Sequence, residues 1–155
     1  MRERYFPHDP SAPPPLRMTA ARRVRFEEAD PLGIVWHGCY ASYFEDARER
    51  LGDRLGIGYL DFFSRGFAIP VRRLTVDYLR PLAYPDELCI EAALHWSEAM
   101  RLNYEFTITA RGGVCATGFC VHLLVGRDDR SIQLTMPDFY REFLDRWRAG
   151  EINLP

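Results

Sequence analysis

The sequence predicts one α+β domain, in which an antiparallel sheet of five or six strands packs on one long helix and a short helix follows near the end. Three observations lead to this prediction. One amphipathic helix begins near residue 37, alternating apolar and polar residues dominate the chain after residue 67, and short turns separate the alternating runs. A single early helix among antiparallel strands is best buried by the sheet itself.

Length and composition are those of one domain. The chain has 155 residues, enough to bury a core without disulfide or metal support. Residues 1–17 are rich in proline, which cannot donate sheet hydrogen bonds, and are predicted to form a poorly packed N-terminal tail. Residues 18–150 then form the domain and residues 151–155 a C-terminal tail.

Charge and residue usage exclude several classes of function. The formal net charge is −2, so no overall field favours nucleic acid as a partner. No apolar run suggests a signal peptide or a membrane span, and a cytoplasmic location is expected. All 20 basic residues are arginine, which excludes chemistry that needs a Schiff-base or phosphate-loop lysine. The four cysteines form no C-x-x-C pair and are interpreted as reduced thiols.

The first elements lead into an acidic turn. Alternation from Met18 to Glu27 predicts a strand, and Asp30-Pro-Leu-Gly33 has the composition of a turn. A helix is expected from about His37 to Leu55. Its apolar face recurs at helical spacing and consists of Tyr40, Tyr43, Phe44, Ala47 and Leu51. Gly56 ends this helix, and residues 59–64 predict one further helical turn.

The second half of the chain is predicted to be mostly strands. The expected strands, which show period-two alternation, are residues 67–78, 88–96, 102–110, 119–125 and a short one near Ile132. A shift of phase at Arg72-Arg73 predicts a bulge in the first of them. Arg111-Gly-Gly113 predicts a hairpin, and a terminal helix is expected from about Pro137.

A carboxylate and an imidazole stand at the start of the long helix. Asp30 lies seven residues before His37. The first N–H groups of a helix have no carbonyl partner and can hold negative charge, so this arrangement suits attack on a carbonyl carbon. Each residue also has a structural interpretation, Asp30 as a turn residue and His37 as a core or helix-start residue. Cys39 is either a third candidate, if the helix end lowers its pKa, or a small buried residue.

The residues Asp30-Pro-Leu-Gly-Ile-Val-Trp-His37, followed by Tyr40, Tyr43-Phe-Glu45 and Ala47-Arg48, resemble the hotdog-fold acyl-CoA thioesterases of the 4-hydroxybenzoyl-CoA thioesterase family. The segment from Val76 to Leu88 is similar to a strand of that family that ends in an Arg-Pro turn. The resemblance covers about residues 19–147. It implies a hotdog fold, and a homodimer or homotetramer with active sites at the subunit interface.

The resemblance also implies roles for particular residues. Family thioesterases carry an aspartate at the position of Asp30, which acts as general base or nucleophile. The backbone N–H at the position of His37 polarises the thioester carbonyl, and its imidazole is also implicated. The expected reaction is hydrolysis of an acyl-CoA or acyl-carrier-protein thioester, with no cofactor besides the coenzyme A of the substrate. Trp36 departs from the more usual Tyr or Phe and, like the additional tail, could reshape the acyl pocket.

Further residues are candidates for contact with substrate or oxyanion. Aromatic residues near the helix start suit an acyl group, and a guanidinium fork suits the phosphates of coenzyme A. The candidates are Gly38 for the oxyanion through its N–H, Trp36 and Tyr40 for the acyl group, and Arg72, Arg73 and Arg80 for the phosphates. No metal is predicted, because His95 and His122 have no second ligand at useful spacing. Glu45 is a reserve carboxylate and, with Arg48, a predicted surface or interface pair.

Two alternatives remain open at this point. A hotdog hydratase or dehydratase acting on enoyl or 3-hydroxyacyl thioesters also uses an acid and a histidine. A non-catalytic module that binds acyl thioesters would keep the fold without turnover. The sequence leaves undecided the acyl group, coenzyme A against carrier protein, dimer against tetramer, whether Asp30 attacks carbon or activates water, and the role of the proline-rich tail.

Overall fold

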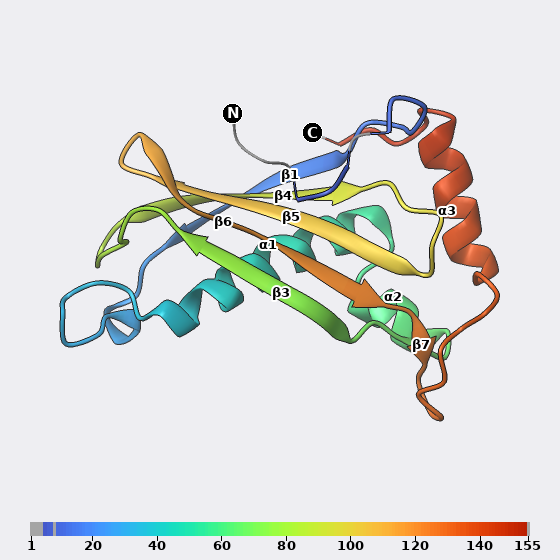
Figure 1. Cartoon of the computed structure of the whole chain (residues 1–155), viewed down its shortest axis with the longest axis horizontal. Helices are drawn as coiled ribbons and strands as arrows, with labels where there is room; N and C mark the ends of the chain where they lie inside the picture. The colour runs from blue at the N-terminus through green and yellow to red at the C-terminus, as the bar shows by residue number, and fades with distance from the viewer. Residues whose placement is uncertain (1–4, 8, 155) are drawn as a thin grey trace.

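The computed structural model describes residues 5–7 and 9–154. A five-stranded antiparallel sheet of order β1-β4-β5-β6-β3 lies along one long helix, α1 (Figure 1). Its strands are β1 (Leu16–Arg23), β3 (Val71–Tyr78), β4 (Glu87–His95), β5 (Arg101–Ala110) and β6 (Gly113–Leu123). The predicted α+β fold, with one sheet packed on one long helix, is confirmed.

Helix α1 (Tyr40–Leu55) follows directly on a 3-10 turn (His37–Cys39), so the helical run has the predicted bounds and only its first turn is tighter. The five apolar residues predicted for its inner face are all buried. Phe44 stacks on Phe106 of β5 with ring centroids 4.5 Å apart. Gly56 ends the helix in the left-handed conformation, at φ 72°.

Gly118 of β6 allows a close approach between the sheet and Phe44 of α1. A Cβ atom there would meet the carbonyl oxygen of Thr75 in β3 and the ring of Phe44. Because side chains alternate along a strand, the residue after Gly118 faces the other way. Phe119 therefore lies on the outer face of the sheet, away from α1.

Three strand predictions need correction. The short strand expected near Ile132 is only an isolated bridge between Val125 and Ile132. β1 ends at Arg23 and not at residue 27, because Phe26–Glu28 forms a 3-10 turn in which the Glu28 carboxylate accepts the N–H of Arg25. The long strand predicted over residues 67–78 is broken at Pro70, which has no N–H for a ladder. The predicted bulge, between Val71 and Arg73, is confirmed.

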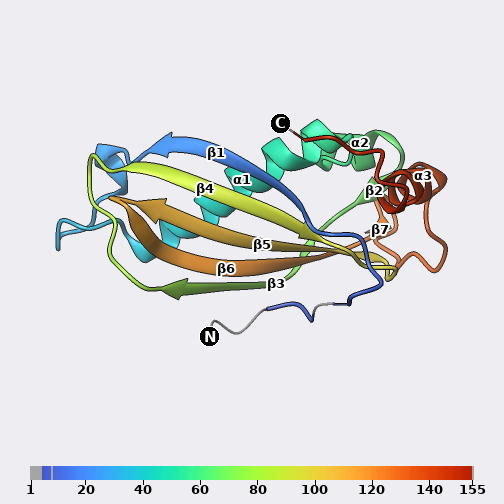
Figure 2. The ribbon, with the colours of Figure 1, turned by 90° about the horizontal axis from the view of Figure 1, so that it is seen from above.

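The remaining elements gather at one end of the sheet, whereas the loop before α1 lies at the other end (Figures 1 and 2). They are α2 (Tyr59–Ser64), β2 (Phe67–Ala68) paired with β7 (Val125–Gly126), and α3 (Asp138–Arg148). Both helices occur where they were predicted. In the part of the chain that the structure describes, no helix combines the length and apolar character that crossing a membrane requires.

The described part of the segment predicted as a tail packs on the outer face of the sheet. The ring of Tyr5 lies 4.9 Å from that of Phe119, and its hydroxyl lies 2.9 Å from the Thr117 hydroxyl oxygen. Phe6 contacts both Phe119, at 5.5 Å, and His95, at 5.1 Å between ring centroids. Residues 1–4 and 8 of that segment, and residue 155 of the C-terminal tail, lie outside the described residues. β1 begins at Leu16, so the last two residues of the predicted tail, 16 and 17, belong to this strand.

Candidate active site

Asp30 lies in a tight turn at one end of the sheet. Its N–H donates to the carbonyl oxygen of Ile34 at 2.8 Å, and the N–H of Gly33 donates back to the Asp30 carbonyl at 2.9 Å. Gly33 adopts φ 78°, a conformation that favours glycine. Oδ1 of Asp30 accepts the N–H of Leu32 at 2.8 Å, while Oδ2 has no hydrogen-bond partner among the described residues. One carboxylate oxygen therefore stabilises the turn and the other is available to a ligand.

Hydrogen bonds on both sides hold this turn in place. Ala29 and Val35 form an antiparallel bridge, and the N–H of Trp36 donates to the carbonyl of Glu28 at 2.8 Å. The N–H of Val35 donates to the carbonyl of Leu82, also at 2.8 Å, which ties the turn to the segment after β3. The chain from residue 28 to 36 is thus a short two-stranded ladder with Asp30 near its tip.

His37 begins the helical run at the end of that ladder. The N–H groups of His37 and Gly38 lack the carbonyl one turn earlier that later helical residues have, and within residues 5–7 and 9–154 neither donates to another backbone group. The carbonyl of His37 accepts a 3.0 Å hydrogen bond from the hydroxyl of Tyr78. The helix therefore presents two unused N–H donors next to the acidic turn.

A pocket of about 470 Å³ brings the predicted acid and the helix start together. Its polar walls are Asp30, His37, Tyr40, Tyr78 and Arg80, and its apolar walls are Leu32, Ile34, Val35, Leu79 and Pro81. The rings of Tyr40 and Tyr78 meet edge to face at 4.9 Å. A mainly apolar pocket with a few converging polar groups is the usual form of a small-molecule site. A larger cavity, of about 670 Å³, lies beneath the N-terminal segment and contains none of these residues.

The three arginines predicted for phosphate contact lie in different places. Arg80 lines the pocket, and its Nε donates to the carbonyl of Val114 at 3.0 Å. Arg72 and Arg73 lie near the other end of β3, about 17 to 20 Å from Tyr78 at ~3.3 Å per strand residue. The Arg73 guanidinium contacts the outer face of the sheet. Within one chain the structure brings only Arg80 to the pocket.

Trp36 lies beside the pocket and not in its wall. Its indole ring lies 5.1 Å from the imidazole of His37 and is 52% exposed. The same ring covers Gly38 so closely that a Cβ atom there would collide with it. The sequence analysis gave the Gly38 N–H a role at the oxyanion, and the structure adds that Gly38 makes room for the indole.

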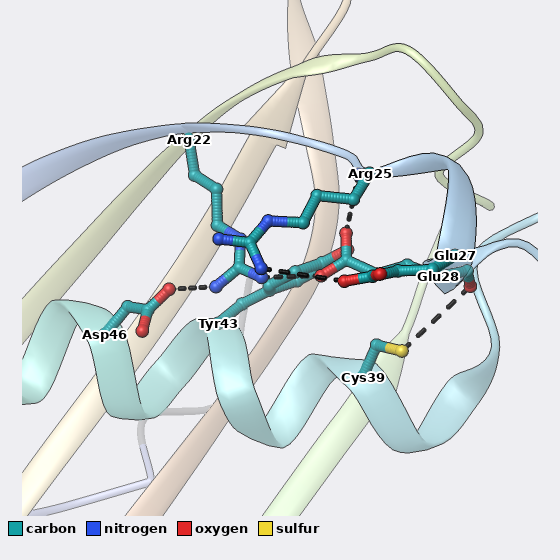
Figure 3. A network of polar contacts seen from close by, with 7 residues as sticks. All are labelled: Arg22, Arg25, Glu27, Glu28, Cys39, Tyr43 and Asp46. Atoms are coloured by element: carbon teal, nitrogen blue, oxygen red, sulfur yellow. Dashed lines mark hydrogen bonds and ion pairs between the residues drawn. The ribbon is translucent and has the colours of Figure 1, made fainter.

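Sequence analysis did not single out Glu28, which is the centre of a polar network behind the turn (Figure 3). This carboxylate is only 8% exposed. Its Oε1 accepts from Nη2 of Arg22 at 2.5 Å, and its Oε2 accepts from the N–H of Arg25 and the hydroxyl of Tyr43, both at 2.8 Å. Arg22 also pairs with Asp46 of α1. The network joins β1, the 3-10 turn and α1.

The protonation of this network follows from its contacts. Burial alone would raise the pKa of Glu28, but the hydrogen bonds from Arg25 and Tyr43 and the charge of Arg22 outweigh it and hold that pKa below its ordinary value. Burial, together with the hydrogen bond to Glu28, raises the pKa of the Tyr43 hydroxyl. Burial and the Glu28 charge also raise the pKa of the Cys39 thiol, so the lowering expected from the helix end does not occur.

A second polar cluster lies deeper under α1. The predicted pair of Arg48 and Glu45 forms, with Nε and Nη2 of Arg48 donating to Oε2 of Glu45 at 3.1 and 2.5 Å, but Arg48 is buried and not at the surface. His122 is also buried, and its Nδ1 lies 2.9 Å from the carbonyl oxygen of Ile69. Burial lowers the pKa of His122. Both groups are therefore held by the fold and do not line the pocket.

A sheet packed on one helix, with an acidic turn ahead of that helix, defines a hotdog-fold protein. The chain belongs to the Thioesterase-like superfamily, whose family model matches residues 24–145. This finding confirms the family resemblance deduced from the Asp30-to-His37 segment.

Several relatives and solved structures are similar to the chain. The 1,4-dihydroxy-2-naphthoyl-CoA hydrolase of Nostoc punctiforme is 26% identical over 131 residues, which cover 84% of this chain and 88% of that protein. The acyl-CoA thioester hydrolase YbgC of Escherichia coli is 29% identical over 72 residues, 46% of this chain and 54% of that protein. The structure of a DHNA-CoA thioesterase from Staphylococcus aureus superposes with a TM-score of 0.75 at 25% identity, covering 88% of this chain and 97% of that one.

Proposed function

We propose that the protein hydrolyses an acyl-CoA or acyl-carrier-protein thioester to a free acid and a thiol. The observation that carries this proposal is that Asp30 and His37, whose N–H donates to no backbone group among the described residues, line one mainly apolar pocket. Membership of the Thioesterase-like superfamily supports it. The relatives act on different thioesters by name, so the acyl group of this protein's substrate is left to experiment.

In the mechanism that we favour, Oδ2 of Asp30 takes a proton from a water molecule, and the resulting hydroxide attacks the thioester carbonyl carbon. The carbonyl electrons move to oxygen, and the N–H groups of His37 and Gly38 stabilise that oxyanion. When the tetrahedral intermediate collapses, the C–S bond breaks and the sulfur leaves with the proton held by Asp30. The imidazole of His37 is a weaker candidate donor to the same oxygen.

Direct attack by Asp30 is the alternative. A carboxylate oxygen would bond to the carbonyl carbon, the thiolate would leave, and water would then hydrolyse the mixed anhydride. A single turnover in ¹⁸O-labelled water separates the two routes. Water activation places solvent oxygen in the first acid released, whereas direct attack followed by hydrolysis at the Asp30 carbonyl carbon places a protein oxygen there.

The site is proposed to lie between two copies of the chain. β3 is the last strand of the sheet in the described part of the chain, and its exposed side chains include Val71, Leu74 and Tyr78. Antiparallel pairing of two β3 edges about a two-fold axis would place the Arg72 and Arg73 end of one copy beside the pocket end of the other. Those arginines could then contact coenzyme A phosphates at the neighbouring pocket.

A thiol-release assay over a panel of acyl-CoA substrates tests the proposed function. Removing the base in Asp30→Asn is expected to lower kcat by on the order of 10²- to 10⁴-fold. Asp128→Asn, an exposed carboxylate beyond β7, is the matched control and is expected to keep the full rate. No thiol release from any acyl-CoA or acyl-carrier-protein substrate, or an undiminished rate in Asp30→Asn, would contradict the proposal. Loss of enoyl-CoA absorbance without thiol release would favour a hydratase.

A further inference from the structure

Three elements of the structure meet at Glu28, although its side chain does not line the pocket. The carboxylate binds Arg22 of β1, the N–H of Arg25 and the hydroxyl of Tyr43 on α1 (Figure 3). Burying a carboxylate is costly unless hydrogen bonds replace its lost water. Here both oxygens are bonded, so the group ties the start of the acidic turn to the sheet and to α1.

The main chain of Glu28 continues the same connection. At the base of the ladder, the Glu28 carbonyl accepts the N–H of Trp36 at 2.8 Å. Nearer the tip, the Asp30 N–H donates to the carbonyl of Ile34, also at 2.8 Å. One side of the ladder leads from Glu28 to Asp30. The other leads through Trp36 to His37 and the helix start. Loss of the Glu28 anchor would therefore loosen the ladder that holds the acid relative to the N–H donors.

We propose that Glu28 is a positioning residue, which anchors this ladder to β1 and α1 and so fixes the Asp30 carboxylate relative to the N–H groups of His37 and Gly38. The inference rests on the proposed function, in which those groups act on one thioester. A displacement of about 1 Å between reacting groups can lower a rate by on the order of 100-fold. Glu28 therefore acts on kcat through Asp30, without touching substrate.

Both carboxylate oxygens are needed for this role. Glutamine has the same length, but it offers only one acceptor oxygen and adds an N–H₂ donor. In Glu28→Gln that donor would face either the guanidinium of Arg22 or the donors of Arg25 and Tyr43. At least one side of the network would then be lost. Tyr43→Phe removes a single bond to the same carboxylate and leaves the rest in place.

The first measurement is steady-state kinetics on these variants. Glu28→Gln is expected to lower kcat by about 10- to 100-fold and to change KM by no more than about threefold, since the pocket walls are unchanged. Tyr43→Phe is expected to lower kcat by about three- to tenfold. The double variant should be little worse than Glu28→Gln, because both changes break one network. Glu27→Gln, whose side chain is 75% exposed, is the matched control and keeps the wild-type kcat.

A second measurement separates positioning from loss of stability. Leu144→Ala removes a buried side chain of α3 and leaves a cavity at the end of the sheet opposite to the Asp30 turn. It is expected to lower Tm while leaving the kcat of the folded enzyme unchanged. Amide hydrogen exchange reports on the ladder without reference to activity. In Glu28→Gln the N–H groups of Asp30 and Trp36 should exchange at least about tenfold faster than in the wild type, and faster than their neighbours in α1.

Asp30→Asn, assayed in parallel, distinguishes failure of this inference from failure of the proposed function. If Asp30→Asn keeps the wild-type rate, or if no substrate is hydrolysed, the proposed function is wrong. The positioning role of Glu28 is then wrong as well, because it rests on that function. If Asp30→Asn is inactive while Glu28→Gln and Tyr43→Phe keep kcat within about twofold, only the positioning role is wrong. An equal loss of kcat in Glu28→Gln and Leu144→Ala at matched Tm would also overturn it.

Discussion

The hydroxyl of Tyr78 donates a 3.0 Å hydrogen bond to the carbonyl oxygen of His37. Tyr78 belongs to the edge strand β3, and His37 begins the helical run. This bond is a direct link between the proposed subunit edge and the proposed oxyanion site. A change at the edge can therefore alter the position of the N–H donors.

We predict that Tyr78→Phe lowers kcat/KM by about two- to tenfold, which corresponds to the loss of one hydrogen bond of about 0.5–1.5 kcal/mol. Thiol-release kinetics measure this effect. Tyr84→Phe is the control, because Tyr84 is similarly exposed, at 49% against 52%, and has no hydrogen bond from its hydroxyl in the described residues. Equal kinetics for both variants and the wild type would show that the link to His37 has no role.

Gly38→Ala is predicted to impair activity through Trp36. The added Cβ would collide with the indole ring, which must then leave its place beside His37. We expect a loss in kcat/KM of about tenfold, since the ring packs against the proposed oxyanion site. The double variant Trp36→Ala, Gly38→Ala should be no less active than Trp36→Ala alone. A full loss in the double variant would instead indicate that Gly38 itself approaches the substrate.

The pH dependence of stability should reveal the Glu28 carboxylate. Its pKa is lower in the folded protein than its ordinary value of 4.5, so the folded state binds the proton less readily than the unfolded chain. The stability that the Glu28 carboxylate contributes is fully present above its ordinary, unfolded-state pKa. It is lost as the pH falls through the lower folded-state pKa. Tm is therefore expected to fall less steeply from about pH 6 to about pH 3 in Glu28→Gln than in the wild type. Parallel curves of Tm against pH for Glu28→Gln and the wild type would contradict this prediction. The control variant Glu27→Gln should show the same pH dependence of Tm as the wild type.

Gly118→Ala is predicted to destabilise the fold at the contact between α1 and the sheet. The added methyl group meets the Thr75 carbonyl oxygen, which is backbone, and the stacked ring of Phe44. Overpacking of this kind costs about 1–3 kcal/mol in the free energy of unfolding, which urea denaturation measures. Cys89→Ala, an exposed position on β4, should change that energy by less than about 0.5 kcal/mol. A Gly118→Ala protein as stable as the wild type would mean that β3 can move away freely.

The fold could be predicted because its signals are local. The apolar spacing of α1, the alternation of β5 and the turn residues at Arg111-Gly112 each appear within a short window of sequence. The break at Pro70 is also visible in the sequence, since a residue without N–H cannot sit inside a paired strand. The prediction of one long strand gave the alternation more importance than the proline.

The network at Glu28 could not be predicted in the same way. Its partners come from positions 22, 25 and 43, and nothing in their spacing shows that β1 and α1 lie side by side. The outer position of Phe119 is a similar case. Alternation shows which residues share a face, but only the packed structure shows which face meets the helix. The Asp30 turn was easier to find, because the acid, the turn and the helix start lie within eight residues.

The packing of Tyr5 and Phe6 on Phe119 bears on how copies of the chain can meet. A second copy that stacked its sheet on this outer face would first have to displace both rings and expose the surface they bury. The backbone edge of β3 pairs with no strand among the described residues, so joining there displaces no such contact. The described residues of the N-terminal segment therefore disfavour stacking of a second copy on the outer face, and they pair with no backbone group of the β3 edge.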